Sequence, residues 1–125
     1  MKPAAQRTFT LAEIDDRLVR TLPRWRFEEG HLVRTYRTEN WKATLMVVNT
    51  VGHLAEVAWH HPDLAVSYAA VTVKLQSHDA QGITERDFEL AAQIEAVVQW
   101  QPGRSTGALE GTPDDPRYRY VHYDD

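Results

Sequence analysis

The stretch from Asn40 to Ala58 constrains the fold of this chain most. It contains no proline, and its only glycine is Gly52. Its apolar side chains recur at helical spacing on two neighbouring faces, and a helix that is apolar over so wide an arc is usually buried by more than one neighbour. Pro62 disfavours helical geometry at the residue before it, so the helix should end near Trp59 or His60. The sequence therefore predicts a central helix against which the rest of a small domain packs.

Two further helices are predicted from their starting signals. Thr10 followed by Glu13 matches a capping box and begins a short apolar repeat at helical spacing. Thr84 followed by Asp87 resembles a second N-cap, and the apolar stripe after it should end by Pro102. These two helices stand before and after the central one.

Two β-hairpins are predicted between the helices. Alternating runs over 25–28 and 31–38 flank the turn pair Glu29-Gly30. The run from Asp63 to Ser77 is rich in β-branched residues and too long for one strand of about 5 or 6 residues, so we divide it near Ala69-Ala70. The order helix, two strands, helix, two strands, helix predicts an α+β fold, a two-layer arrangement in which an antiparallel four-stranded sheet carries the helices on one face.

Length and composition suit one domain followed by a tail. The chain has 125 residues, of which 42% are apolar, enough for a single core. We assign the domain to residues 1–102. Glycine, proline and small polar residues then mark 103–125 as a C-terminal linker and tyrosine-rich tail, whose final segment RYRYVHYDD would suit a short strand laid on the surface.

Charge and hydropathy exclude several classes of protein. The formal net charge is -4 and the basic residues are scattered, which is not typical of a nucleic-acid binder. The chain has no cysteine, so disulfides, thiolate zinc sites and cysteine nucleophiles are excluded. The N-terminus lacks the apolar core of a signal peptide, and no window approaches the roughly 20 apolar residues of a membrane span. We therefore expect a cytoplasmic protein that contacts neither nucleic acid nor membrane.

Three histidines are expected to meet at one edge of the sheet. His60 and His61 lie where the central helix ends, and His78 follows the second hairpin, which should return the chain to the same edge. Imidazole titrates near neutrality, with an unperturbed pKa of about 6.5, so one histidine can give a proton while another takes one. Glu56 lies one helical turn before His60, within reach of fixing the orientation or tautomer of an imidazole. The three histidines and Glu56 are therefore candidates for general acid-base catalysis, with the glutamate orienting an imidazole.

Spacing alone leaves other interpretations open. The HHP cluster would equally suit a structural helix end. Three histidines and a glutamate also have the ligand chemistry of zinc, but adjacent histidines rarely point at one ion, so no metal site is predicted. His31, His53 and His122 are expected to be ordinary solvated or capping residues. Most aromatic residues should lie in the core, with one or two lining a flat ligand: Trp25, Tyr36, Trp41 and Tyr68.

Taken together, these residues resemble a known family. The segment EVAWHHP at 56–62, followed by Tyr68, His78 and Asp87, is similar to the signature of the pterin-4a-carbinolamine dehydratases, also called dimerization cofactor proteins. Every interval of that signature is kept, and the similarity extends roughly over 22–98. The resemblance implies a two-layer fold whose antiparallel sheet carries helices on one face.

The resemblance also implies a reaction. The family dehydrates a 4a-hydroxy-tetrahydropterin, made by aromatic amino acid hydroxylases, to a quinonoid dihydropterin and water, without metal or cofactor. In this hypothesis His60 and His78 hold and protonate the hydroxyl group, while His61 moves the proton at N5 or positions the ring. Glu56 has the orienting role.

Further positions concern binding of the pterin. Trp25 matches a family position near the pterin, and Asp87 matches the final acidic residue of the signature, although a helix cap explains it equally well. Trp59 stands where the family usually has Asp or Asn, which adds a large ring beside the site. Gln81 occupies a position commonly held by glycine, and Thr38 one commonly held by an aromatic residue.

The resemblance leaves two functions in competition. The first is the dehydratase, and the second is a non-catalytic interaction protein on the same scaffold, since relatives act as a transcription-factor dimerization cofactor or as an assembly factor for RuBisCO. In the second case the tail would bind a protein partner and Trp59 would block the pocket, so pterin binding separates the two. Family members form dimers and tetramers. The two-faced apolar helix and an uncovered sheet edge predict a homodimer or homotetramer here.

Overall fold

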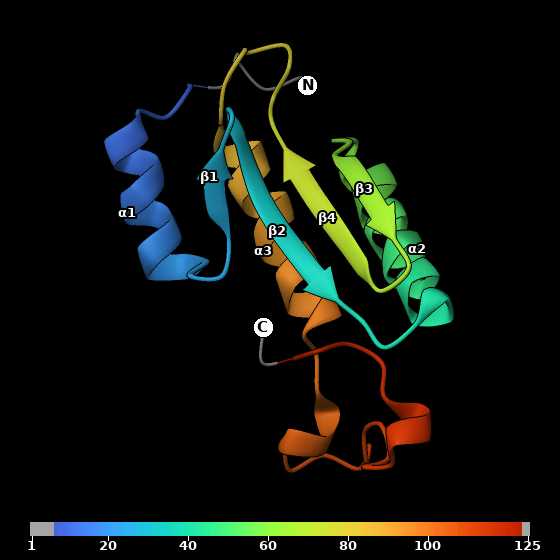
Figure 1. Cartoon of the computed structure of the whole chain (residues 1–125). Coiled ribbons are helices and arrows are strands. Elements are labelled where there is room, and N and C mark those ends of the chain that lie inside the picture. The colour runs from blue at the N-terminus through green and yellow to red at the C-terminus, as the bar shows by residue number, and fades with distance from the viewer. Residues whose placement is uncertain (1–6, 124–125) are drawn as a thin grey trace.

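The computed structural model describes residues 7–123, which form helices and strands in the predicted order (Figure 1). Residues 1–6 and residues 124–125 lie outside this range. They belong to the N-terminal segment, for which the sequence predicts no signal peptide, and to the predicted tail. In chain order the elements are α1 (Leu11–Thr21), β1 (Arg26–Glu28), β2 (His31–Arg37), α2 (Trp41–Ala58), β3 (Asp63–Ser67), β4 (Ala70–Leu75), α3 (Glu85–Val98) and the short 3₁₀ turns η1 (Pro102–Arg104) and η2 (Pro116–Tyr118).

The four strands form one antiparallel sheet in the order β1-β2-β4-β3, which confirms the predicted α+β fold. In the first hairpin Glu29 and Gly30 both have positive φ, 49° and 81°, as required by the two-residue turns that match strand twist. In the second hairpin Tyr68 and Ala69 connect β3 to β4, next to the predicted division. Both hairpins therefore occur where the sequence predicts them.

Polar side chains begin each helix. Thr10 and Glu13 form a complete capping box before α1, and Thr84 and Asp87 form another before α3. The side chain of Asn40 caps α2. Each cap satisfies backbone N–H groups that have no partner within the helix, which is why these helices begin at these residues.

The core lies between one face of the sheet and the helices. In Figure 1, α2 and α3 lie behind the sheet and α1 stands beside β1. Along β4 the buried residues alternate, with Val71, Val73 and Leu75 facing the helices. Ile14 and Leu18 bring α1 into the same apolar cluster. None of the helices within 7–123 combines the length and apolar character needed to cross a membrane.

A charged cluster fixes α3 to the sheet. The Glu95 carboxylate accepts hydrogen bonds from Trp25 Nε1 at 3.0 Å, from Arg34 Nε at 3.0 Å and from the Tyr36 hydroxyl at 2.7 Å. Burial acts to raise the pKa of Glu95, but the hydrogen bonds from Arg34 and Tyr36 outweigh it and hold that pKa below its usual value. Burial also raises the pKa of Tyr36, so its phenol stays protonated and can donate.

The C-terminal segment folds back over the end of β2. Val121 forms an isolated antiparallel bridge with Thr38 and joins the core, and His122 pairs with Glu39. The prediction of a short strand here is wrong in extent, because that single bridge is all the strand pairing the segment makes up to residue 123. A 3₁₀ turn, Pro116–Tyr118, takes in Arg117 and Tyr118, the first residues of the predicted strand, because proline fixes its own φ and favours the start of a turn.

Candidate functional site

The end of α2 points two adjacent histidines in different directions. Trp59 caps the helix in the left-handed conformation, with φ 51° and ψ 46°. The N–H of His60 still donates to the carbonyl of Ala55 at 3.1 Å, after which Pro62 prevents the helix from continuing. The helix thus ends as predicted. The side chains of His60 and His61 contact different carboxylates.

Trp59→Gly is expected to raise the free energy of unfolding by about 0.5 to 1 kcal/mol. The left-handed conformation strains every residue except glycine, and this gain exceeds the entropy that glycine adds to the unfolded chain. The Trp59 side chain is 74% exposed, so removing it loses little packing. Urea unfolding measures the change. Gln81→Gly, at another left-handed position with φ 55°, should also raise the free energy of unfolding. A Trp59→Gly variant less stable than wild type would show that the backbone of Trp59 is not strained.

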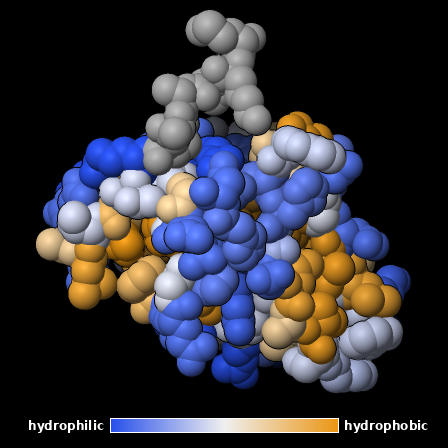
Figure 2. Space-filling view, turned by 90° about the horizontal axis from the view of Figure 1, so that it is seen from above, coloured by the Kyte–Doolittle hydropathy of each residue, from blue (hydrophilic) through white to orange (hydrophobic). Residues whose placement is uncertain are grey.

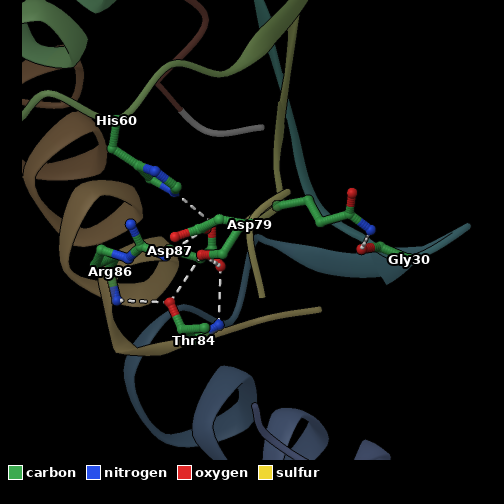
Figure 3. Close-up of polar contacts among 8 residues, drawn as sticks. Gly30, His60, Asp79, Thr84, Arg86 and Asp87 are labelled. Atoms are coloured by element: carbon green, nitrogen blue, oxygen red, sulfur yellow. Dashed lines mark hydrogen bonds and ion pairs between the residues drawn. The ribbon is translucent and has the colours of Figure 1, made fainter. Parts of the chain in front are cut away.

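His60 is held by a buried carboxylate in the first turn of α3 (Figure 3). Its Nε2 lies 2.6 Å from Oδ1 of Asp87, whose side chain is 0% exposed. The other carboxylate oxygen accepts from the Ser77 hydroxyl at 2.7 Å and from the Thr84 N–H at 2.9 Å. An ionised carboxylate can only accept, so Nε2 of His60 carries a hydrogen and Nδ1 is left for another group. Asp87 is therefore both the predicted helix cap and a partner of a predicted catalytic residue.

Glu56 contacts the other histidine of the pair. Its Oε1 lies 2.9 Å from Nε2 of His61, and both side chains are exposed. The Trp59 ring stands edge-on to the His61 ring, with centroids 5.0 Å apart. The orienting carboxylate predicted at Glu56 thus serves His61, on the outer surface, whereas the deeper His60 is oriented by Asp87.

His78 lies in the loop between β4 and α3, beside His31 at the start of β2. Its neighbour Ser77 bonds to Asp87, so the backbone of His78 is one residue from the network that holds His60. The His78 ring lies 6.4 Å from the ring of His31, which was expected to be an ordinary solvated residue. The signal that could have found His31 is register: Leu32 pairs with Leu75, which sets the start of β2 against the end of β4.

A small cavity of about 290 Å³ opens between the end of α2 and the start of α3. Apolar residues of both helices line it together with His60, Arg86 and Glu89. This volume is near the lower end for small-molecule sites in proteins. Trp59 is not among the lining residues, so its ring does not block this cavity.

Other residues of the sequence signature lie away from His60. Trp25 is buried in the core and bonds to Glu95, eight residues beyond Asp87 on α3 and so about 12 Å further along the helix. Tyr68 is exposed in the turn between β3 and β4, at the end of β3 opposite His61. Of the predicted site residues, the structure joins His60 to Asp87 and His61 to Glu56. The His78 ring lies against His31, and only its neighbour Ser77 bonds to the first pair.

The tail forms a second, larger cleft. It measures about 1290 Å³, and its walls come from the end of α3 and from the tail itself, including Trp100, Tyr120 and Tyr123. None of the three signature histidines lines it, so the larger volume is not where the acid-base groups lie. Within the described part of the chain, no three His, Asp or Glu side chains are grouped so as to hold a metal ion.

Comparison with known proteins identifies the family of this chain. Residues 7–97 match the family model for pterin 4 alpha carbinolamine dehydratase. A relative from Aquifex aeolicus is 47% identical over 83 residues, covering 66% of this chain and 84% of its own. One from Chloroflexus aurantiacus is 44% identical over 87 residues, covering 70% and 92%. Both are provisionally named as dehydratases of this kind. The chain belongs to the pterin-4-alpha-carbinolamine dehydratase family.

A solved structure shares the fold. The crystal structure of a transcriptional coactivator/pterin dehydratase from Brucella melitensis matches with a TM-score of 0.67 over 73% of this chain and 98% of that chain. The sequence identity is 24%, so the likeness concerns the fold alone. The family match ends at residue 97, so the segment that forms the larger cleft with the end of α3 lies beyond it.

Proposed function

We propose that this protein dehydrates a 4a-hydroxy-tetrahydropterin to the quinonoid dihydropterin. The carbon–oxygen bond at C4a breaks, the oxygen leaves as water after taking a proton, and the N5 proton departs as a C4a–N5 double bond forms. Such a reaction needs one acid and one base on a flat heterocycle, and it consumes no oxidant or reductant. Positioned histidines meet that need without metal or cofactor.

The observation that carries the proposal is the His60–Asp87 pair. A buried carboxylate that accepts from Nε2 fixes the tautomer and orientation of the imidazole, as in other acid-base sites. Nδ1 then faces away from Asp87 and is free to exchange a proton with the substrate. We assign the hydroxyl group and its protonation to His60 and His78, and the N5 proton or ring positioning to His61, oriented by Glu56.

The competing function is that of an interaction protein. Exposed side chains on and before the tail favour it, among them Trp100, Leu109 and Tyr118. It also required Trp59 to block the pocket, but that ring is solvent-exposed and does not line the cavity beside His60. The geometry therefore supports the dehydratase better.

Binding of a stable reduced pterin, such as 7,8-dihydropterin, tests the choice between the two. We expect saturable binding by isothermal titration calorimetry, weakened in His60→Ala and kept in His53→Ala, which alters an exposed residue of α2. Absence of binding by the folded wild-type protein would favour the interaction protein instead.

We further propose that the chain forms at least a homodimer. β3 is at the edge of the sheet, and seen from above the side of α2 and β3 carries hydrophobic surface (Figure 2). Val66 on β3 and Val57 on α2 are both exposed there. Such edges and patches favour association between copies. Sedimentation velocity should give a species larger than 14.4 kDa at micromolar concentration, reduced by Val66→Glu but not by Val19→Glu on α1; a wild-type monomer alone would refute it.

A further inference from the structure

Trp59 is a large apolar side chain at a position where the fold gains little from it. Its backbone is left-handed, with φ 51° and ψ 46°, a conformation that glycine, asparagine and aspartate tolerate and other residues adopt only with strain. The residue is 74% exposed, so burial in the core does not offset the strain. Residues that break a local rule without a gain in stability are typical of functional sites.

The indole ring of Trp59 contacts the imidazole of His61. The two ring centroids lie 5.0 Å apart and the ring planes meet at 82°, an edge-to-face arrangement that is favourable between aromatic rings. The left-handed turn at Trp59 and the proline after His61 restrict the backbone on both sides of the pair. The freedom that is left to the imidazole is therefore mainly the rotation of its own side chain.

The hydrogen bond from Glu56 is too weak to hold this imidazole in one orientation by itself. Oε1 of Glu56 lies 2.9 Å from Nε2 of His61, but the two side chains are 68% and 52% exposed, and pairs between exposed groups contribute little. One bond to one ring atom also leaves the ring plane free to turn about that bond. The edge-on indole opposes this rotation, because turning the imidazole would lose the aromatic contact.

The same hydrogen bond decides which nitrogen of His61 can react. An ionised carboxylate only accepts, so Nε2 carries the hydrogen and Nδ1 has a free electron pair. Of the two roles assigned to His61, this tautomer suits that of the base. Nδ1 binds the N5 proton, and the electrons of the N5–H bond form the C4a–N5 double bond. The C4a–O electrons leave with the hydroxyl oxygen, which takes a proton from the acid and becomes water.

We propose that Trp59 is a positioning residue, whose ring holds the His61 imidazole with Nδ1 turned toward N5 of the pterin. The proposal rests on the proposed dehydratase function and on the role of His61 as the base. Trp59 exchanges no proton and does not line the cavity beside His60. The worth of one aromatic contact corresponds to a change of about 2- to 10-fold in the fraction of His61 that is in the reactive orientation.

Three substitutions at Trp59 separate the ring from the backbone strain. Trp59→Asn removes both, Trp59→Leu removes the ring alone, and Trp59→Phe keeps both. We expect kcat for dehydration to fall about 2- to 10-fold in the first two with KM unchanged, and to stay within about twofold of wild type in Trp59→Phe. Trp59→Asn should also unfold at a higher urea concentration than wild type, so that stability and activity change in opposite directions. Trp100→Leu removes another exposed indole and is the matched control, which should keep the kcat of wild type.

A double variant shows whether the ring acts through His61. Trp59→Leu combined with His61→Ala should be no slower than His61→Ala alone, because residues that work as a unit are not additive. Nuclear Overhauser effects between the indole and imidazole protons, present in the wild-type protein, check the contact without reference to activity.

A folded Trp59→Leu variant with the kcat of wild type would overturn the proposal. A loss that appears in KM alone would also overturn it, because Trp59 would then be a binding residue, and so would independent losses that multiply in the double variant. In each of these cases a wild-type protein that dehydrates the pterin through His60 keeps its proposed function. A folded wild-type protein that does not accelerate dehydration overturns both.

Discussion

His60→Ala is expected to lower kcat for pterin dehydration by about 10²- to 10⁴-fold, the usual worth of a positioned acid or base. The fold should survive, because among residues 7–123 the His60 side chain bonds to Asp87 alone, and Asp87 keeps Ser77 and Thr84 as partners. Stopped-flow absorbance of freshly generated 4a-hydroxy-tetrahydropterin measures the rate. His53→Ala is the matched control and should leave it unchanged.

Asp87 should prove to act through His60. An asparagine at position 87 presents an amide that cannot serve as a charged acceptor, so Asp87→Asn should lower kcat as well. The double variant His60→Ala, Asp87→Asn should be no slower than His60→Ala alone, because residues that work as a unit are not additive. Independent, multiplicative losses would contradict the pairing.

Glu95→Ala is expected to lower the free energy of unfolding by about 3 kcal/mol. The change removes the carboxylate that accepts from Arg34, whose side chain is only 4% exposed, and from Trp25 and Tyr36, and removing one partner of a buried ion pair is strongly destabilising. Urea unfolding provides the value. Glu89→Ala, at an exposed position on the same helix, should cost no more than about 0.5 kcal/mol. Equal effects of the two substitutions would show that the cluster does not stabilise the fold.

The stability that Glu95 contributes should depend on pH. Its native pKa lies below the ordinary value of 4.5, so the folded state favours the ionised form, and the contribution is present in full above that pH. As pH falls through the native pKa, both states become protonated and the contribution is lost. The difference between wild type and Glu95→Ala should therefore narrow on going from neutral pH to about pH 3. A constant difference would assign the effect of the substitution to lost packing.

Most of the fold could be predicted because its signals are local. The capping residues Thr10, Asn40 and Thr84 each start a helix, and Pro62 stops one. The turn pair Glu29-Gly30 fixes the first hairpin. The tail could not be predicted in this way, because its single bridge to Thr38 depends on an edge of β2 that exists only in the folded sheet.

The sequence predicts which residues belong to the candidate site, but it does not predict which carboxylate bonds to which histidine. Helical spacing brings Glu56 within reach of an imidazole, yet the left-handed Trp59 turns His60 away and leaves Glu56 beside His61. Asp87 meets His60 through the contact of α2 with α3, which no short-range pattern reveals. The position of His31 was missed for the same reason, since its neighbour His78 is distant in the sequence.

The rate of dehydration itself tests the central claim most directly. Freshly generated 4a-hydroxy-tetrahydropterin is mixed with the wild-type protein in a stopped-flow instrument, and formation of the quinonoid dihydropterin is compared with the rate in buffer. We predict an acceleration that rises with protein concentration and is lost in His60→Ala. A folded wild-type protein that leaves the rate at its value in buffer would contradict the assignment of this site as a dehydratase.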